Sequence, residues 1–211
     1  MIFAILPVKS PSASKQRLKG LLTPEQRETL ARMLFRRTLA SLCQARGIDQ
    51  VVVVTSDSEC ARLGRMAGAL IFEEAAQVSH SKSADAACLR AAELGATTAM
   101  LVPIDVPTVT SDDFTALAAA AHAGLVVVPS SDGTGTNALV RTPPTCIESM
   151  YGPGSFRAHL EQASSKNIPT TVQKIPGIMF DIDTPEDVKL LLQGPPVSEI
   201  TPFLEAVCAW S

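Results

Sequence analysis

The stretch VVVVTSDSECARLGRM (residues 51–66) decides the fold class of this chain. Val51–Thr55 is a continuous run of β-branched residues, which is typical of a strand buried on both faces. Ser56-Asp57-Ser58-Glu59 then carries the pattern of a capped helix start, and Ala61–Met66 continues the helix. A buried strand that leads directly into a capped helix is the repeating unit of α/β proteins.

The same unit recurs on both sides of this stretch. Helix starts occur at Thr23-Pro24-Glu25-Gln26, Ser111-Asp112-Asp113 and Thr184-Pro185-Glu186-Asp187. Alternating strands and helices imply right-handed crossovers, a mainly parallel sheet and helices on both faces. Less helix separates the later strands, so we expect a mixed sheet in the C-terminal half. Besides Val51–Thr55, the predicted strands are Ile2–Leu6, Ala69–Phe72, Ala99–Val102, Leu125–Val128, Ala138–Arg141, Thr170–Gln173 and Ile178–Asp181.

Length and composition fit one α/β domain. The chain has 211 residues, of which 46% are hydrophobic but only 4% aromatic, so the core must consist of Ala, Val, Leu and Ile. We place the domain at residues 1–193, because Gly194-Pro195-Pro196 ends the last core helix. Residues 194–211 form a tail with a short helical pattern. Its apolar residues can pack on the domain or on a second subunit, which would make a homodimer: Phe203, Leu204, Val207 and Trp210.

Charge and cysteine content exclude several classes of protein. The net charge of −3 leaves no basic stripe for nucleic acid. No apolar stretch approaches 18 residues and no basic segment precedes the first strand, so we expect a soluble, cytoplasmic protein without membrane attachment. The five cysteines are scattered and show neither zinc-site nor disulfide spacing: Cys43, Cys60, Cys88, Cys146 and Cys208.

A basic loop follows the first predicted strand. Ligands of open α/β sheets bind at the carboxyl ends of the strands, where this loop must lie. Lys9, Lys15 and Arg17 stand in it among several hydroxyl groups. Ammonium and guanidinium groups can balance the charge of a triphosphate. On composition alone, a solvated surface loop is an equally good interpretation.

Aspartates follow two other predicted strands. Asp105 stands between prolines in PIDVP (residues 103–107), and Asp181 and Asp183 open DIDTPED (residues 181–187). Carboxylate oxygens are the ligands that Mg²⁺ prefers, with nucleotide phosphates completing its coordination. Asp183 lies further out of its strand and is the better partner for Asp105. The structural alternatives are a turn-forming Asp105 and helix-capping aspartates at 181–187.

Two glycine-containing turns complete the set. GTGTNA (residues 133–138) and YGPGSF (residues 151–156) can present backbone N–H groups to an anion, and a helix beginning at Ser155 would add its dipole. The first turn lacks the third glycine of a dinucleotide fingerprint, and no P-loop motif occurs in the sequence. Alone, it is equally compatible with a hairpin. His159 follows the second turn, and we expect it on the surface of the helix.

Taken together, the motifs resemble the 2-phospho-L-lactate guanylyltransferase family of deazaflavin-coenzyme biosynthesis, which includes enzymes that use phosphoenolpyruvate or 3-phospho-D-glycerate. The resemblance covers residues 6 to 188. Its combination of GTNAL, GPGSF and DIDTPED is specific, although each motif alone is not. It is carried by PVK, KQRL, VVVVTSD, PIDVP, GTNAL, GPGSFRAH and DIDTPEDV.

The resemblance implies a nucleotide-diphospho-sugar-transferase-like fold, GTP as the donor and a small phosphorylated carboxylic acid as the acceptor. It also implies Mg²⁺ held by Asp105 with Asp183 or Asp181. The catalytic set we expect is Lys9, Lys15, Arg17 and Asp105. For the acid we expect Thr136, Asn137, Gly152 and Ser155, and for the nucleotide Pro7, Lys9, Lys15, Arg17, Ser56, Asp57 and Asp85.

One position departs from the family pattern. Ser83-Ala84-Asp85 stands where the family carries Gly-Leu-Asn, so an amide is replaced by a carboxylate and the contacts there are in doubt. Two alternatives remain open on the sequence. One is a molybdenum-cofactor or sugar-type nucleotidyltransferase, and the other is a non-catalytic nucleotide-binding module.

Overall fold

The computed structural model describes residues 1–74 and 79–208. Its strands are β1 (Ile2–Val8), β2 (Gln50–Thr55), β3 (Leu70–Glu73), β4 (Thr98–Leu101), β5 (Gly124–Pro129), β6 (Thr136–Thr142) and β7 (Thr170–Val172). Its helices are α1 (Pro24–Gln44), α2 (Ser58–Met66), α3 (His80–Glu93), α4 (Ser111–Ala119), α5 (Ser155–Ser165), α6 (Pro176–Met179), α7 (Pro185–Gln193) and α8 (Ile200–Val207). Two 3₁₀ turns, η1 (Pro11–Ala13) and η2 (Gln16–Leu18), shape the basic loop.

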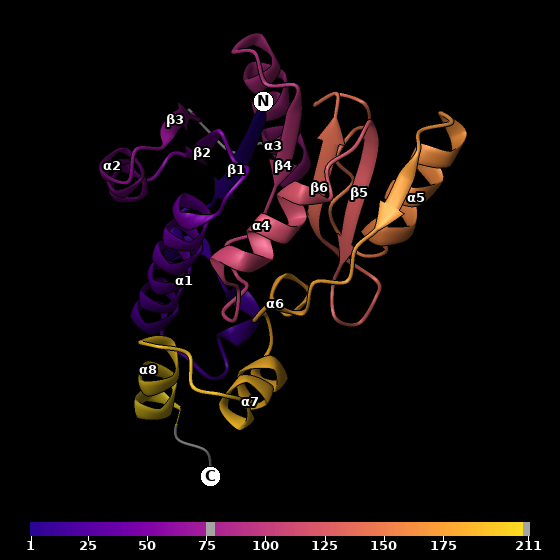
Figure 1. The fold of residues 1–211 in the computed structure, drawn as a ribbon. Coiled ribbons are helices and arrows are strands. Elements are labelled where there is room, and N and C mark those ends of the chain that lie inside the picture. The colour runs from indigo at the N-terminus through magenta and orange to yellow at the C-terminus, as the bar shows by residue number, and fades with distance from the viewer. Residues whose placement is uncertain (75–78, 209–211) are drawn as a thin grey trace.

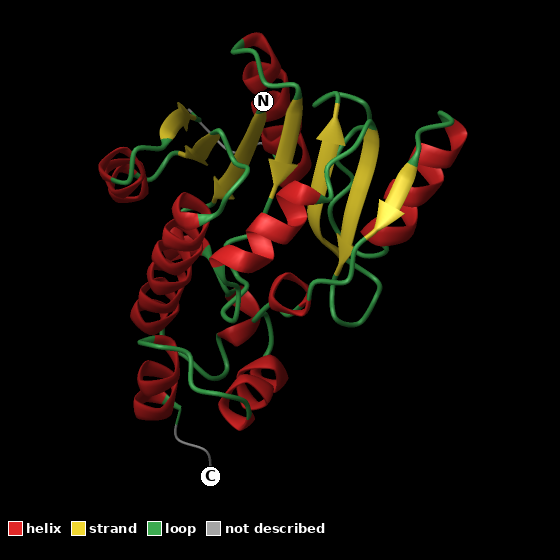
Figure 2. Ribbon diagram, viewed as in Figure 1, coloured by secondary structure: helices red, strands yellow, loops and turns green. Residues whose placement is uncertain are grey.

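One mixed sheet forms the centre of the molecule (Figures 1 and 2). Its strand order is β3-β2-β1-β4-β6-β5-β7, and the pairs are parallel except those that β6 makes with β4 and β5. The expected mainly parallel sheet, mixed toward its C-terminal half, is therefore confirmed. Because β6 alone is reversed, its first residue, Thr136, lies at the edge where the other strands end. That edge gathers the candidate site.

The two sheet faces bury separate apolar cores. Successive strand residues point to opposite faces; Leu6, Val53 and Met100 join one core, and Ile5, Val52 and Leu101 join the other. The first core packs against α1, α2, α4 and α6, and the second against α3 and α5. Helices therefore cover both faces, as predicted.

The helix starts agree with the sequence. Capping boxes at Thr23, Thr110 and Thr184 open α1, α4 and α7, and the Asp57 carboxylate caps α2. These caps satisfy backbone N–H groups that have no partner within the helix.

The predicted strand Ile178–Asp181 is wrong. Pro176 begins the short helix α6 instead, and the chain then passes through residues 181–183 without joining the sheet. Proline fixes its own φ and suits the first position of a helix, so the apolar residues after Pro176 form a helical turn instead of a strand. Ile178 is fully buried against the first core.

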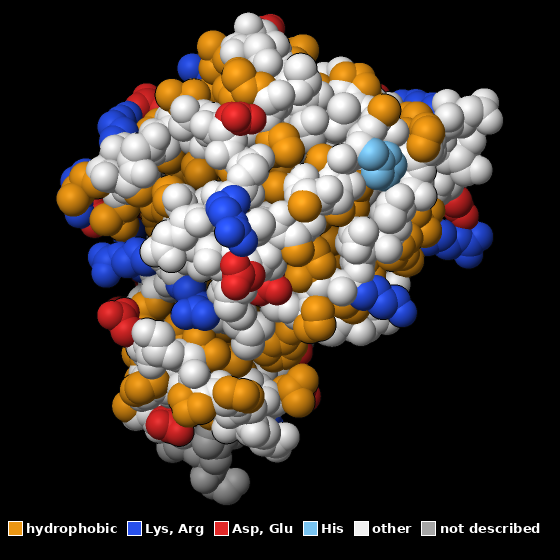
Figure 3. Space-filling view, in the orientation of Figure 1, with side chains coloured by type: hydrophobic (Ala, Val, Ile, Leu, Met, Phe, Trp, Pro, Cys, Tyr) orange, Lys and Arg blue, Asp and Glu red, His pale blue; other side chains and the backbone are white. Residues whose placement is uncertain are grey.

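The C-terminal segment packs on the domain. α8 contacts α1 and α7, and Leu204 is fully buried in a third apolar cluster, against which Phe203 and Val207 also pack. Trp210 lies outside the described residues. No described helix combines the length and apolarity needed to cross a bilayer. On the face drawn in Figure 3, acidic and basic side chains lie scattered among apolar and uncharged ones, without a basic stripe.

Candidate active site

Two adjoining cavities lie at the edge of the sheet that holds Thr136. The outer cavity has a volume of about 530 Å³, and its wall includes Lys9, Lys15 and Arg17. The inner cavity has a volume of about 140 Å³, and its wall includes Thr136 and Asn137. Five residues line both cavities, which therefore form one continuous cleft: Pro7, His80, Pro103, Asp105 and Tyr151.

Three carboxylates meet at this cleft. Asp105, Asp181 and Asp183 each offer an oxygen within 4.8 Å of the others. No strand pairing brings the two segments together. Instead, the buried Ile182 donates its backbone N–H to the carbonyl of Asp105 at 3.0 Å, so the aspartates on either side of Ile182 are held beside Asp105.

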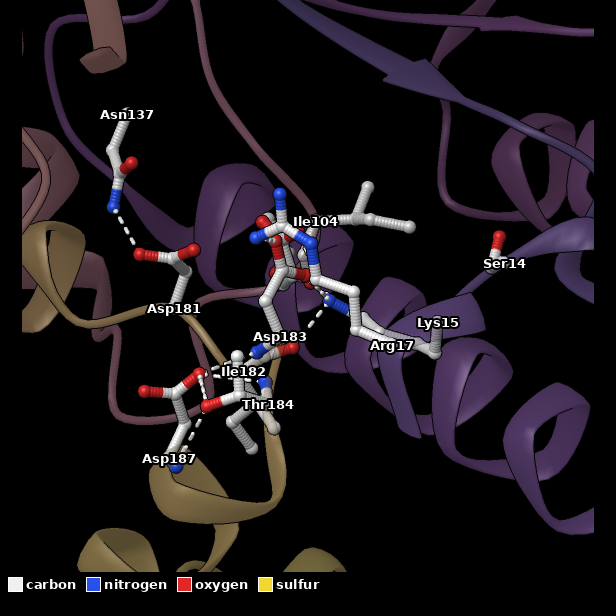
Figure 4. Close-up of polar contacts among 12 residues, drawn as sticks. Ser14, Lys15, Arg17, Ile104, Asn137, Asp181, Ile182, Asp183, Thr184 and Asp187 are labelled. Atoms are coloured by element: carbon white, nitrogen blue, oxygen red, sulfur yellow. Dashed lines mark hydrogen bonds and ion pairs between the residues drawn. The ribbon is translucent and has the colours of Figure 1, made fainter. Parts of the chain in front are cut away.

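Lys15 lies within this carboxylate cluster (Figure 4). Its Nζ donates to Asp105 Oδ2 and Asp183 Oδ1, both at 3.0 Å, and to the carbonyl oxygen of Ile182 at 2.6 Å. Its side chain is only 4% exposed, and its backbone is left-handed with φ 56°. Such a φ is unfavourable for a side chain other than glycine, and these three bonds help to hold it. In this structure Lys15 therefore neutralises the aspartates rather than facing solvent.

The carboxylates experience different electrostatic environments. Burial opposes ionisation of Asp105, but the Lys15 ammonium outweighs that effect and lowers the pKa of Asp105. Burial also opposes the charge of Lys15, yet Asp105 and Asp183 together raise the pKa of Lys15. Asp181 makes no ion pair with Lys15, and burial beside Asp105 raises the pKa of Asp181 to about 6.

The donor set suits a hard divalent cation. It consists of oxygen atoms, which Mg²⁺ prefers, and the Lys15 ammonium shows that the cluster binds positive charge. Burial and the charge of Asp105 raise the pKa of Asp181, and a cation bound at the cluster would offset both effects. Asp105 and Asp183 share Lys15, whereas Asp181 accepts a hydrogen bond from Asn137 Nδ2 at 3.1 Å.

The remaining basic groups line the outer cavity. Lys9 contributes to its wall, and Arg17, whose side chain is 71% exposed, lies 3.8 Å from Asp183. Pro7, in β1, lines both cavities. Ser56 and Asp57 line neither of them. Asp57 caps α2 and pairs with Arg32, and Ser56 is exposed beside it.

Three of the four predicted acid-binding residues line the cleft. Thr136 and Asn137 line it directly, and Gly152 lines the outer cavity. Asn137 also donates to the carbonyl oxygens of Ile178 and Met179, both at 2.9 Å, so it ties α6 to β6. Ser155 is buried at the start of α5, and its hydroxyl accepts from the Thr136 backbone N–H at 2.9 Å.

The turn at residues 130–135 has the geometry of a hairpin. The backbone N–H groups of Gly133, Thr134 and Gly135 are bonded within the turn, to Ser130 and Asp132, so they are not free to bind an anion there. Hydrogen bonds from the Ser130 hydroxyl and from the backbone N–H and hydroxyl of Thr134 lower the pKa of Asp132 to about 2. Of the two interpretations, the hairpin describes this segment.

Two other residues differ from their expected surroundings. His159 is fully buried rather than on the helix surface, because its ring bonds Thr136 and Met150. Asp85 pairs with the buried Arg141 at 2.8 Å and accepts from the backbone and hydroxyl of Ser149. The carboxylate at this position thus serves a buried guanidinium, and it lines neither cavity.

Sequence reasoning assigned no role to His80 and Tyr151, although both line the two cavities. Their rings make an edge-to-face contact, with centroids 4.7 Å apart. Burial, together with the charge of Lys9, lowers the pKa of His80. For His80 the sequence does contain a signal, because Ser79 caps the helix that begins with His80.

Comparisons with known proteins agree with this geometry. Residues 2–201 match the family described as "Guanylyl transferase CofC like". The chain is 35% identical to the phosphoenolpyruvate guanylyltransferase of Sphaerobacter thermophilus, over 92% of this chain and 94% of the relative. It is 30% identical to the 3-phospho-D-glycerate guanylyltransferase of Colwellia psychrerythraea, over 92% and 93% of the two chains.

Solved structures show the same fold. A nucleotide-diphospho-sugar transferase structure from Desulfovibrio desulfuricans G20 superposes with a TM-score of 0.78 at 14% identity, covering 97% of this chain and 94% of the other. A nucleotidyl transferase from Methanothermobacter gives a TM-score of 0.59 at 15% identity, covering 98% and 99%. The family match covers nearly the whole chain. This protein is therefore a nucleotidyltransferase and belongs to the CofC-like guanylyl transferase family.

Proposed function

We propose that the protein transfers GMP from GTP to a small phosphorylated carboxylic acid and releases pyrophosphate. The acids we expect are phosphoenolpyruvate, 3-phospho-D-glycerate and 2-phospho-L-lactate. This would place the reaction in the biosynthesis of the deazaflavin coenzyme F420. The family match and the relatives named above support the choice of guanine nucleotide and acid.

The observation that carries the proposal is the position of the three carboxylates between the two cavities. Asp105 lines both cavities, Asp183 lines the outer one and Asp181 lines the inner one. The outer cavity has basic groups and room for a nucleoside triphosphate. The inner cavity, of about 140 Å³, is far smaller than the roughly 300–1,000 Å³ typical of drug-sized ligands. It therefore suits a three-carbon acid better than a pterin.

The chemistry requires charge control rather than a general base. A phosphate monoester has a second pKa of about 6, so the phosphate group of the acceptor is already mostly dianionic at neutral pH. Its oxygen forms a bond to the α-phosphorus of GTP while the bond to the β-phosphate oxygen breaks. Lys9 and Arg17 would hold the triphosphate oxygens and stabilise the departing pyrophosphate.

Mg²⁺, held by Asp105 and Asp183 with Asp181 beside them, would neutralise phosphate charge. Lys15 would then turn from the aspartates toward the phosphates, since one cluster cannot hold the metal ion and the ammonium at the same place. This reconciles the observed position of Lys15 with its expected contact to nucleotide.

The test is release of pyrophosphate by the purified protein. Each of GTP, ATP, CTP and UTP is combined with each acid, with a sugar phosphate and with molybdopterin, in the presence of Mg²⁺ or of EDTA. We expect turnover only with Mg²⁺, and the highest rate with GTP and one of the three acids. A higher rate with another nucleotide, or with a sugar phosphate or molybdopterin, would contradict the proposal. No turnover with any pair would support a non-catalytic nucleotide-binding module.

A further inference from the structure

A chain of buried hydrogen bonds leads from α5 to the inner cavity. His159, on α5, is fully buried and lines neither cavity. One ring nitrogen, Nε2, lies 2.8 Å from the backbone nitrogen of Met150. The other, Nδ1, lies 3.0 Å from the hydroxyl oxygen of Thr136. Thr136 does line the inner cavity.

The Met150 contact fixes the tautomer of His159. A backbone N–H can only donate, so Nε2 must accept and carries no proton. The ring proton of the neutral imidazole is then on Nδ1, which donates to the Thr136 oxygen. Burial, with a contribution from Arg141, lowers the pKa of His159 to about 4, in keeping with a neutral ring.

The direction of the bond decides what Thr136 can do. Its oxygen accepts from His159, so its own hydroxyl proton remains available to another partner. Among the described residues, no side chain or carbonyl accepts a hydrogen bond from that hydroxyl. The Thr136 backbone N–H is bonded to the Ser155 hydroxyl, which holds the residue in place. The proton can therefore be donated into the cavity.

The surrounding turn is held as firmly as the ring. Three consecutive backbone N–H groups, those of Ser149, Met150 and Tyr151, donate to side chains of Asp85, His159 and Ser81. The Tyr151 ring also packs edge-on against the His159 ring, with centroids 5.7 Å apart. A ring so confined cannot easily exchange its two nitrogens.

We propose that His159 is a positioning residue that orients the Thr136 hydroxyl as a hydrogen-bond donor to an anionic oxygen of the phosphorylated acid. The proposal rests on the function proposed above. Because Nδ1 of His159 always donates to Thr136, the Thr136 hydroxyl can only donate to the substrate. It therefore favours substrates that present a charged oxygen there over those that present an N–H or O–H group. His159 itself touches no substrate.

The first test needs no catalysis. The chain contains only three histidines, so the ¹⁵N chemical shifts of their side chains can be assigned with single variants. We expect the His159 ring in the wild-type protein to be neutral and protonated on Nδ1. A ring protonated on Nε2 would overturn the proposal, whether or not the enzyme accepts any of the three acids.

The second test separates the two bonds of the ring. In His159→Gln the amide oxygen can replace Nε2 and accept from Met150, but nothing donates to Thr136. In His159→Asn the amide nitrogen can replace Nδ1 and donate to Thr136, but Met150 loses its acceptor. We expect His159→Gln to raise the KM for phosphoenolpyruvate about tenfold, as for a lost contact to a charged group, with an unchanged KM for GTP. We expect His159→Asn to lower Tm and largely spare that KM.

A double variant tests whether His159 acts through Thr136. Thr136→Val should raise the KM for phosphoenolpyruvate about tenfold, and adding His159→Gln should then change it less than about twofold. Independent, multiplying effects would contradict the proposal. His122→Gln is the matched control, because His122 also bonds a threonine hydroxyl, that of Thr171 at 3.0 Å, but outside the cleft. If the wild type accepts 3-phospho-D-glycerate instead, the same comparison is made with that acid, and a wild type without turnover contradicts the proposed function alone.

Discussion

Replacing Lys15 by methionine should make the metal-free protein markedly less stable. The substitution keeps the length of the buried side chain but removes its charge, leaving Asp105 and Asp183 without the ammonium that bridges them at 3.0 Å. Two ionised carboxylates with oxygens no more than 4.8 Å apart repel each other by at least about 3.5 kcal/mol at an effective dielectric constant of about 20. For a domain of this size, about 3 kcal/mol corresponds to a fall in Tm of about 6–12 °C.

Thermal unfolding at about pH 8, where free aspartates are ionised, measures this effect in EDTA and in Mg²⁺. We expect Mg²⁺ to restore most of the lost Tm in Lys15→Met and to raise the Tm of the wild type less, because there the ion must displace Lys15. Turnover should fall in the variant even though the metal binds more tightly. Lys19→Met, an exposed lysine of the same loop, is the control. An equal loss of Tm with and without Mg²⁺ would refute the reasoning, since Lys15 would then contribute packing alone.

Three further variants test other parts of the site. Arg17→Ala should raise the KM for GTP about tenfold without changing Tm, because an exposed side chain loses one charge-assisted contact. Arg157 on α5 is also exposed but lies outside the cleft, so Arg157→Ala should change neither value. Asp85→Asn should lower the free energy of unfolding by about 1.5–3 kcal/mol in urea titrations, because the buried Arg141 loses its charged partner, and an unchanged midpoint would contradict this role. Asp181→Asn should be more stable than the wild type in EDTA at about pH 8. The pKa of Asp181 is about 6 in the fold against 3.8 for an unperturbed aspartate, so the folded wild type binds more protons and loses stability as pH rises between these values. The advantage of the variant should therefore disappear as pH falls to about 4, and a difference independent of pH would argue against a raised pKa.

Much of the fold could be predicted from local signals. β-branched runs such as Val51–Thr55 and caps such as Thr23 and Thr184 act through neighbouring residues, so the sequence shows them directly. The position of the cleft followed from the same elements, because parallel strands end at a common edge. The run Ile178–Asp181 misled the prediction, since a short apolar run does not by itself distinguish a strand from a buried turn of helix.

The roles of individual side chains were less predictable, because they depend on contacts between distant segments. Lys15 meets an aspartate 90 residues away and another 168 residues away, and nothing near Lys15 in the sequence indicates that it bonds carboxylates rather than phosphate. The role of Asp85 likewise depends on Arg141, which lies on β6, 56 residues away in the sequence. The expectation that His159 lies on the helix surface was wrong, because its burial depends on contacts with Thr136 and Met150 that its position in the sequence does not show.

The third apolar cluster joins parts of the chain that serve different purposes. Leu18 of the basic loop, Ile182 between two aspartates of the cleft and Leu204 of α8 are all fully buried in it. A protein shortened at residues 194–197 would retain every residue that lines the cleft. The basic loop and the segment of residues 181–183 would, however, lose the part of the apolar cluster that α8 contributes. Substitutions on the buried side of α8 offer a way to adjust catalytic rate by engineering, without altering any group that meets a substrate.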